Sequence, residues 1–159
     1  MIMAKCYVET TLEEIENDWD KAVQTAALAA ITMEGIDGEM TVVLTDNEYI
    51  QGLNNEFRHI DAPTDVLSFP ENDLAEPLTD AIGSGFIPEE GDEARIALGD
   101  IYISVERAAQ QAEEYGNTLT EELAFLTVHG ALHLMGYDHI EPEDETIMRE
   151  KQRKALGRE

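Results

Sequence analysis

Three of the four histidines in this chain, His129, His133 and His139, lie within eleven residues. His129 and His133 are four residues apart, so on a helix their imidazoles project from the same face about one turn apart. Gly136 can adopt the left-handed conformation that ends a helix, which lets the chain bring His139 back toward the other two. Three neutral imidazoles placed in this way predict an open tridentate Zn²⁺ site, with a fourth position left for water or substrate.

An alternative interpretation treats these residues as ordinary histidines on a helix and its C-terminal turn. The His-x-x-x-His-x-x-Gly-x-x-His string favours the metal site, because His59 is the only other histidine in the chain. The surrounding helix is apolar, and imidazoles in an apolar helix need polar partners, which a metal ion supplies. We therefore predict that His129, His133 and His139 bind one zinc ion per chain and act as catalytic residues.

The histidine spacing matches that of the metzincin proteases, with one important difference. Those enzymes carry Glu directly after the first histidine as the general base, and Gly130 occupies that position here. Without this carboxylate, ordinary peptide hydrolysis loses its proton acceptor. The string therefore favours a zinc hydrolase that is not a protease. A zinc-dependent hydrolase of peptides or small amides remains the alternative. Tyr137 and Asp138, beside the third histidine, are candidate partners of the metal ligands, and Asp138 is alternatively a turn-stabilising residue.

Arg58 is a second candidate for chemistry. Positive charge is scarce before Arg149, and this arginine stands between an expected helix and an expected strand. A guanidinium suits phosphate oxygens and can stabilise charge that develops on phosphorus. The residues alone nevertheless favour a surface ion pair with Asp61 or Asp65.

The hydrophobic pattern predicts the elements that position these residues. Strands are expected at residues 4–10, 40–44, 64–69 and 94–104, and helices at 12–35, 46–57, 104–116, 118–136 and from 141 onward. Thr10 and Thr11 are expected to cap the first helix, and Thr118 and Glu121 match a capping box before the helix that carries His129. That helix is apolar on most sides, so we expect it at the centre of the core.

Strands and helices interleave, with helices gathering toward the C-terminus, which favours a mixed-sheet α/β or α+β domain. The stretch from Pro70 to Glu93 departs from this pattern, because it is rich in proline, glycine and acidic residues. It is long for a connection inside a compact domain, so it is either a mobile loop or functional, and a mobile excursion is favoured.

Composition limits the function further. The chain has 159 residues, with 35 Asp and Glu against 10 Lys and Arg, a formal charge of −25 and 43% apolar residues. This suits one domain with a hydrophobic core and argues against a general nucleic-acid coat protein or a binder of anionic membranes. The single cysteine, Cys6, excludes an internal disulfide and is expected to be a small buried hydrophobe. No apolar run approaches a membrane span and no signal peptide is evident, so we expect a soluble, cytoplasmic protein.

The string HGALHLMGYDH, from His129 to His139, resembles the signature of the YbeY family, the bacterial rRNA maturation endoribonucleases. Two further segments agree in the same order. They are TDVLSFP from Thr64 to Pro70, preceded by Leu53, Asn54 and Arg58, and LGDIYIS from Leu98 to Ser104. The resemblance covers most of residues 53–148, and the first forty residues match only in general pattern.

This resemblance implies one YbeY-like metal-dependent hydrolase domain over residues 1–159. It implies an α+β, zincin-like fold in which helices pack a mixed four-stranded sheet, with the metal site on a helix of the C-terminal half and the turn after it. The implied activity is zinc-dependent cleavage of single-stranded RNA, in maturation of the 3′ end of small-subunit rRNA and in ribosome quality control. Ribosomes or ribosome-associated proteins are the implied partners, and Arg58 gains a catalytic role near the metal.

Some points stay open. Attack by water and attack by the ribose 2′-OH are both compatible with the residues, the oligomeric state is not indicated, and a non-catalytic ribosome assembly factor is a further alternative. Ile60 and Ala62 stand where family members often carry lysines, which predicts a weaker hold on RNA. With so negative a chain, we expect weak affinity for naked RNA and delivery by a ribosomal or protein partner.

Overall fold

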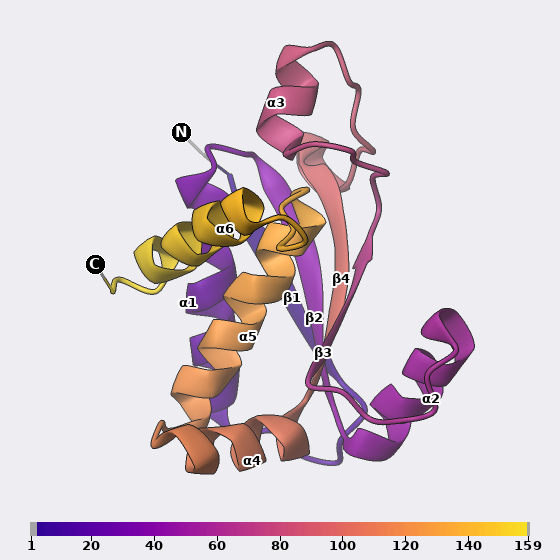
Figure 1. Ribbon diagram of the computed structural model, residues 1–159, viewed down its shortest axis with the longest axis vertical. Coiled ribbons are helices and arrows are strands. Elements are labelled where there is room, and N and C mark those ends of the chain that lie inside the picture. The colour runs from indigo at the N-terminus through magenta and orange to yellow at the C-terminus, as the bar shows by residue number, and fades with distance from the viewer. Residues whose placement is uncertain (1–2, 159) are drawn as a thin grey trace.

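The computed structural model describes residues 3–158 and contains one four-stranded mixed sheet (Figure 1). The strands are β1 (Lys5–Thr10), β2 (Gly38–Thr45), β3 (Val66–Pro70) and β4 (Ile96–Ser104), in the spatial order β1-β2-β4-β3. β1, β2 and β4 run parallel, and β3 pairs antiparallel with β4 at one edge. The predicted α+β class with a mixed four-stranded sheet is confirmed.

The helices cover the two faces of the sheet unequally. α1 (Asn17–Met33) and α5 (Leu119–Leu134) lie side by side on one face, and α2 (Asn47–Arg58) lies on the other (Figure 1). The pleat of β4 shows this division, because Ile101 faces Gly130 of α5 whereas Tyr102 stacks on Tyr49 of α2. α4 (Val105–Tyr115) and α6 (Pro142–Ala155) pack against the two ends of α5.

The predicted capping box of α5 is present, and α4 also has an N-terminal cap. The Thr118 hydroxyl accepts from the Glu121 N–H (3.1 Å), and the Glu121 carboxylate accepts from the Thr118 N–H (2.9 Å), which forms the expected capping box of α5. Ser104 caps α4 by accepting from the Arg107 N–H at 3.2 Å. α5 is buried on most sides, as its composition predicted, so the helix that carries two of the histidines is central to the core.

The first helix begins later than predicted, at Asn17. Thr10 and Thr11 do not cap it. The Thr10 hydroxyl donates to the Leu44 carbonyl (2.9 Å), and the Thr11 hydroxyl lies 2.5 Å from that of Thr45. These contacts extend the attachment of β1 to β2, so the chain leaves the sheet before it can turn into the helix.

A β-bulge lies in β4 at Leu98 and Gly99, opposite Glu39 and Met40 of β2. Gly99 has φ +133°, and a Cβ there would lie 2.3 Å from the carbonyl oxygen of Phe69. Glycine is therefore required for β3 to approach β4 at this point, which is the close backbone contact that a glycine within a strand indicates.

The stretch between β3 and β4 has anchors of its own. It contains α3 (Leu78–Gly83), and the buried Leu78 donates its N–H to the Met135 carbonyl at 2.8 Å. The buried Asn72 side chain donates to the Ala97 carbonyl (2.9 Å) and accepts from the Glu89 N–H (2.7 Å). Composition suggested a mobile excursion, whereas the structure ties this segment to the end of α5 and to β4.

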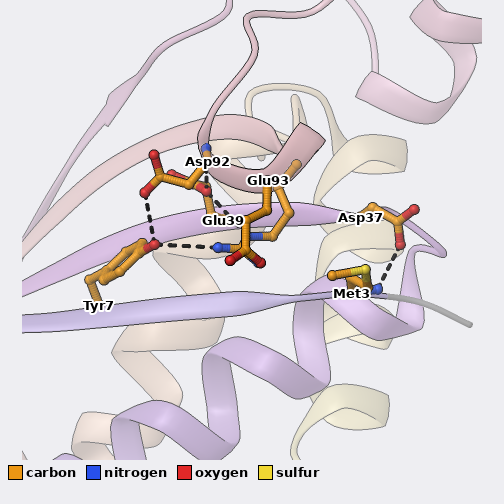
Figure 2. Close-up of polar contacts among 7 residues, drawn as sticks. Met3, Tyr7, Asp37, Glu39, Asp92 and Glu93 are labelled. Atoms are coloured by element: carbon orange, nitrogen blue, oxygen red, sulfur yellow. Dashed lines mark hydrogen bonds and ion pairs between the residues drawn. The ribbon is translucent and has the colours of Figure 1, made fainter.

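A polar network fixes the far end of the same segment, at a short 3₁₀ turn (Asp92–Ala94) (Figure 2). Arg95, which is 8% exposed, donates to Glu39 (3.2 Å), Glu93 (3.3 Å) and the Tyr7 hydroxyl (3.3 Å). Tyr7 in turn donates to Asp92 at 3.0 Å, and the Asp92 N–H donates to Glu39 at 2.9 Å. The entry to β4 is thereby pinned to β1 and β2.

Cys6 is buried in the core, as predicted. Burial, with the nearby Asp20 charge, raises the pKa of its thiol to about 12, so the thiol stays protonated and unreactive. Across residues 3–158, no helix is both long enough and apolar enough to cross a bilayer.

Candidate metal centre

The structure brings His129, His133 and His139 together. Each offers a nitrogen, and these three atoms lie within 4.8 Å of one another. The Nε2 atoms of His129 and His133 are 3.1 Å apart, and the ring centroid of His139 lies 5.6 Å and 5.2 Å from theirs. The predicted convergence of the three imidazoles is confirmed, and the group could hold a metal ion.

The turn after α5 delivers the third histidine. Gly136 has φ +92°, and a Cβ there would lie 2.5 Å from the carbonyl oxygen of Glu76. Glycine is therefore needed both for the turn and for the close packing of the 71–95 segment against it. The Asp138 carboxylate accepts from the Ile140 N–H at 3.3 Å, which supports a turn-stabilising role for Asp138.

The donor set fits a divalent cation. Two nitrogens bound tetrahedrally to zinc at about 2.0–2.1 Å lie roughly 3.3 Å apart, close to the separation of the two Nε2 atoms. Nδ1 of His133 is 2.9 Å from the Tyr137 carbonyl, which only accepts, so Nδ1 carries the proton and Nε2 presents its lone pair. Nε2 of His129 lies 3.1 Å away, so the two nitrogens share either a proton or a bound cation.

Gln152 of α6 orients His129. Its amide nitrogen lies 2.6 Å from Nδ1 of His129, and a half-turn of the amide puts its oxygen in that place. With the amide oxygen turned toward this nitrogen, the oxygen accepts from Nδ1–H and leaves Nε2 free as the ligand atom. Contacts of this kind set the tautomer and the ring orientation of metal-binding histidines.

Burial favours the neutral form of His129 and His133, which is the form that binds a metal ion. Burial, followed by the neighbouring His133 and His139, lowers the pKa of His129 from 6.5 to about 4. Burial also lowers the pKa of His133. At neutral pH no proton has to be displaced from His129 before an ion binds.

A buried cluster of Glu34, Tyr137 and Lys151 stabilises the turn behind His133. The Tyr137 hydroxyl donates a short hydrogen bond to Glu34, whose side chain is 4% exposed. Lys151 donates to the same carboxylate at 2.8 Å and lies 5.0 Å over the Tyr137 ring. The sequence singled out Tyr137 only as a neighbour of the third histidine. The sequence did not indicate a role for Glu34 or Gln152, because each is far along the chain from the residue it contacts, Tyr137 and His129 respectively.

Gly130 has a packing role that explains why it is not glutamate. A Cβ at this position would lie 2.9 Å from two carbon atoms of the Ile101 side chain in β4. The position faces the sheet, and it allows α5 to approach β4 closely. No carboxylate can act on the metal centre from here.

Arg58 ends α2, on the opposite face of the sheet from α5, and its side chain is exposed. Neither of the expected ion pairs forms within residues 3–158. Asp61 instead accepts from Gln51 (2.9 Å), and Asp65 accepts from Gln111 (3.2 Å). No hydrogen bond or ion pair joins Arg58 to the histidines in the same range. Its catalytic role stays a prediction.

Comparison with known proteins agrees with this architecture. The model of the family described as endoribonuclease YbeY matches residues 5–158. An endoribonuclease YbeY from Carboxydothermus hydrogenoformans is 46% identical over 135 residues, covering 85% of this chain and 82% of the relative. Its counterpart from Bacillus licheniformis is 45% identical over 150 residues, covering 94% and 86%.

The solution structure of a Thermotoga maritima protein is also similar. It has a TM-score of 0.60 and 28% identity, and it covers 97% of this chain and 87% of that one. The family match over nearly the whole chain, and relatives above 40% identity that align over most of their own length, lead to one assignment. The chain belongs to the endoribonuclease YbeY family, which has a zincin-like fold.

Proposed function

We propose that this chain is a zinc-dependent endoribonuclease that cleaves single-stranded RNA, built as one metal-dependent hydrolase domain over residues 1–159. The observation that carries the proposal is the convergence of three imidazoles, in a family whose relatives are named endoribonucleases. The proposed cellular substrate is the 3′ end region of small-subunit rRNA. The proposed partners are the ribosome or ribosome-associated proteins, and the proposed site of action is the cytoplasm.

His129, His133 and His139 would hold the ion. When bound, zinc supplies Lewis acidity that polarises a phosphoryl oxygen and lowers the pKa of water. The chain's own contribution is orientation. The Tyr137 carbonyl keeps the proton on Nδ1 of His133, and the Gln152 amide, with its oxygen turned toward Nδ1, does the same for His129. Both Nε2 atoms then face the same point.

Arg58 is the residue we propose to neutralise charge that builds up on phosphorus. Two observations support this role. Within residues 3–158 its guanidinium forms no ion pair, so no carboxylate in that range competes for it. The segment that follows it leads directly into β3, the edge strand against which α5 packs.

The charge of −25 limits how this protein reaches RNA. Much of the basic character of α6 is already neutralised, since Arg149 pairs with Glu145 (2.6 Å) and Lys151 with Glu34 (2.8 Å). Tight binding of naked RNA rests on many phosphate contacts. Because few cations are left unpaired, we expect a weak affinity for naked RNA and delivery of the substrate by a ribosomal partner.

Metal analysis combined with RNA cleavage tests the proposal. The zinc-loaded protein should contain zinc equimolar with the chain and cut a defined single-stranded RNA, but not the same RNA annealed to its complement. Products with 2′,3′-cyclic phosphate ends indicate attack by the ribose 2′-OH, and 5′-phosphate ends indicate water. His133→Ala should lose zinc and cleavage, whereas His59→Ala, the matched control, should keep its zinc. Intact zinc content and cleavage in His133→Ala would refute the site.

The same preparation separates the alternatives. Cleavage of a peptide panel without cleavage of RNA would establish the peptide or amide hydrolase, against which the packing of Gly130 on Ile101 argues. A non-catalytic assembly factor would show ribosome binding that survives His133→Ala, with no cleavage by the unmodified protein. Three ligands count against a structural ion, because structural zinc sites usually have four.

A further inference from the structure

We propose that a cavity beside the metal centre binds a guanine base of the RNA, and that the Glu122 carboxylate selects it. The inference rests on the proposed endoribonuclease function and deepens it, since it names the nucleotide that the site prefers.

The cavity has a volume of about 430 Å³ and lies where the end of α4, the first half of α5 and the start of β3 meet. This volume falls within the range of small-molecule sites. The residues that line it and matter for the argument are Asp65, Tyr115, Asn117, Glu121, Glu122 and Phe125.

The cavity adjoins the metal centre directly. Phe125 precedes His129 by one helical turn, and the two rings stack with centroids 6.3 Å apart and planes at 26°. The Asp65 charge also acts on His129. One turn of helix is about 5.4 Å, so Phe125 links the wall of the cavity to His129.

The chemistry of the walls suits a base rather than a phosphate. Tyr115, 69% exposed, and Phe125 provide aromatic surface, on which splayed bases of single-stranded RNA stack. The polar groups are mostly amides and carboxylates, which accept from ring and amino N–H groups. The cation at the rim, Arg158, is already paired with Glu121 at 3.7 Å.

Glu122 is the carboxylate left to contact a ligand. Asp65 accepts from Gln111 and the Val66 N–H, and Glu121 is committed to the capping box of α5. Glu122 is 5% exposed, and Asn117 is the neighbouring side chain that lowers its pKa most. Burial raises its pKa by more than Asn117 and the charge of Arg158 lower it. A second pair of donors would stabilise its charged form.

Guanine supplies such a pair. Its N1–H and one N2–H point the same way on the Watson–Crick edge, and a carboxylate accepts both at once. Adenine and cytosine present one amino group beside an acceptor, and uracil presents one N–H between two acceptors. In each of these three bases, an acceptor atom would face an oxygen of the Glu122 carboxylate and be repelled by it. A buried carboxylate therefore discriminates for guanine through bonds that the other bases cannot complete.

Nucleoside binding tests the inference independently of cleavage, because nucleosides have no phosphodiester bond. Guanosine and inosine, which lacks the 2-amino group, are titrated by NMR into the zinc-loaded full chain. Guanosine should bind about tenfold more tightly, the expected effect of one lost charge-assisted hydrogen bond. Glu122→Gln should remove this preference, because the amide turns a donor toward the guanine donors. Glu113→Gln, an exposed acid of α4 outside the cavity, is the matched control and should keep it.

A second variant keeps the test decisive if Glu122→Gln does not fold. Tyr115→Ala removes an exposed aromatic ring and should weaken both nucleosides together. Equal affinities for guanosine and inosine, no binding of either, or an unchanged preference in Glu122→Gln would each overturn the inference. RNA cleavage that continues in that case leaves the proposed function intact. A guanosine preference without any RNA cleavage would overturn the function and leave the cavity as a guanine site.

Discussion

The side-chain amide of Gln152 lies 2.6 Å from Nδ1 of His129, although 23 residues separate them in the chain. The contact joins α6 to α5 at the metal centre. Helix α6 therefore contacts a candidate metal ligand without supplying one of the three histidines.

Replacing Gln152 by alanine should weaken zinc binding by about 10- to 100-fold, the usual cost of removing a partner that orients a metal-binding histidine. Gln152→Glu should restore most of the affinity, because a carboxylate accepts from Nδ1–H. The affinity is measured by competition with a chelator of known zinc affinity. Arg153→Ala, at the exposed neighbouring position, is the control. Equal affinities of Gln152→Ala and the parent protein would show that Gln152 does not orient the ligand.

Replacing Tyr137 by phenylalanine should lower the free energy of unfolding by about 1–2 kcal/mol. The change removes the hydroxyl that donates to the buried Glu34 carboxylate and leaves Lys151 as its partner. Urea denaturation measures the difference. Tyr115→Phe removes the same group from a ring that is 69% exposed, and it should change stability by less than about 0.5 kcal/mol.

Features set by neighbouring residues were predictable from the sequence. The capping box at Thr118 and Glu121, the ends of α4 and α5 at glycines, and the convergence of the histidines all depend on contacts within a few positions. Interactions within one or two helical turns determine these features, so the local residue pattern is sufficient to predict them.

Features set by distant contacts were not predictable in the same way. Thr10 and Thr11 look like helix caps until β2 is placed beside them, where Leu44 and Thr45 take their hydroxyls. Glu34 is 117 residues from Lys151, so nothing local marks their pair as part of the metal centre. Acidic residues are so common in this chain that one buried partner does not stand out.

Replacing Arg95 by glutamine should destabilise the protein by about 3 kcal/mol, because it leaves the partly buried Glu39 without its cation. The same change should release the end of the segment between β3 and β4, so limited proteolysis between residues 71 and 95 should become faster. Arg149→Gln removes an exposed ion pair and should cost no more than about 0.5 kcal/mol. An unchanged rate of proteolysis in Arg95→Gln would mean that the anchors at Asn72 and Leu78 hold the segment in place without Arg95.

Replacing Gly130 by alanine should destabilise the protein by about 1–3 kcal/mol, because the added methyl group meets Ile101 at 2.9 Å. Gly52→Ala is the matched control. Gly52 lies within α2 and a methyl group there contacts nothing, so helix propensity should raise stability by up to about 1 kcal/mol. Changes of opposite sign in the free energy of unfolding of the two variants, measured with denaturant, would confirm the packing role of Gly130. A neutral result at Gly130 would contradict it.

The zinc-free protein should lose stability as the pH falls from about 6.5 to 4. His129 has a pKa of about 4 in the folded protein and 6.5 when unfolded, so in this window the unfolded state binds the proton and the folded state does not. Stability therefore falls with falling pH, by up to about 3 kcal/mol at the acid end. Protonation of carboxylates also relieves repulsion among a net charge of −25, which acts in the opposite direction. The decisive quantity is thus the difference between the parent protein and His129→Asn, with His59→Asn as the control. Identical pH dependences in the parent and His129→Asn would show that His129 is not held neutral by its burial.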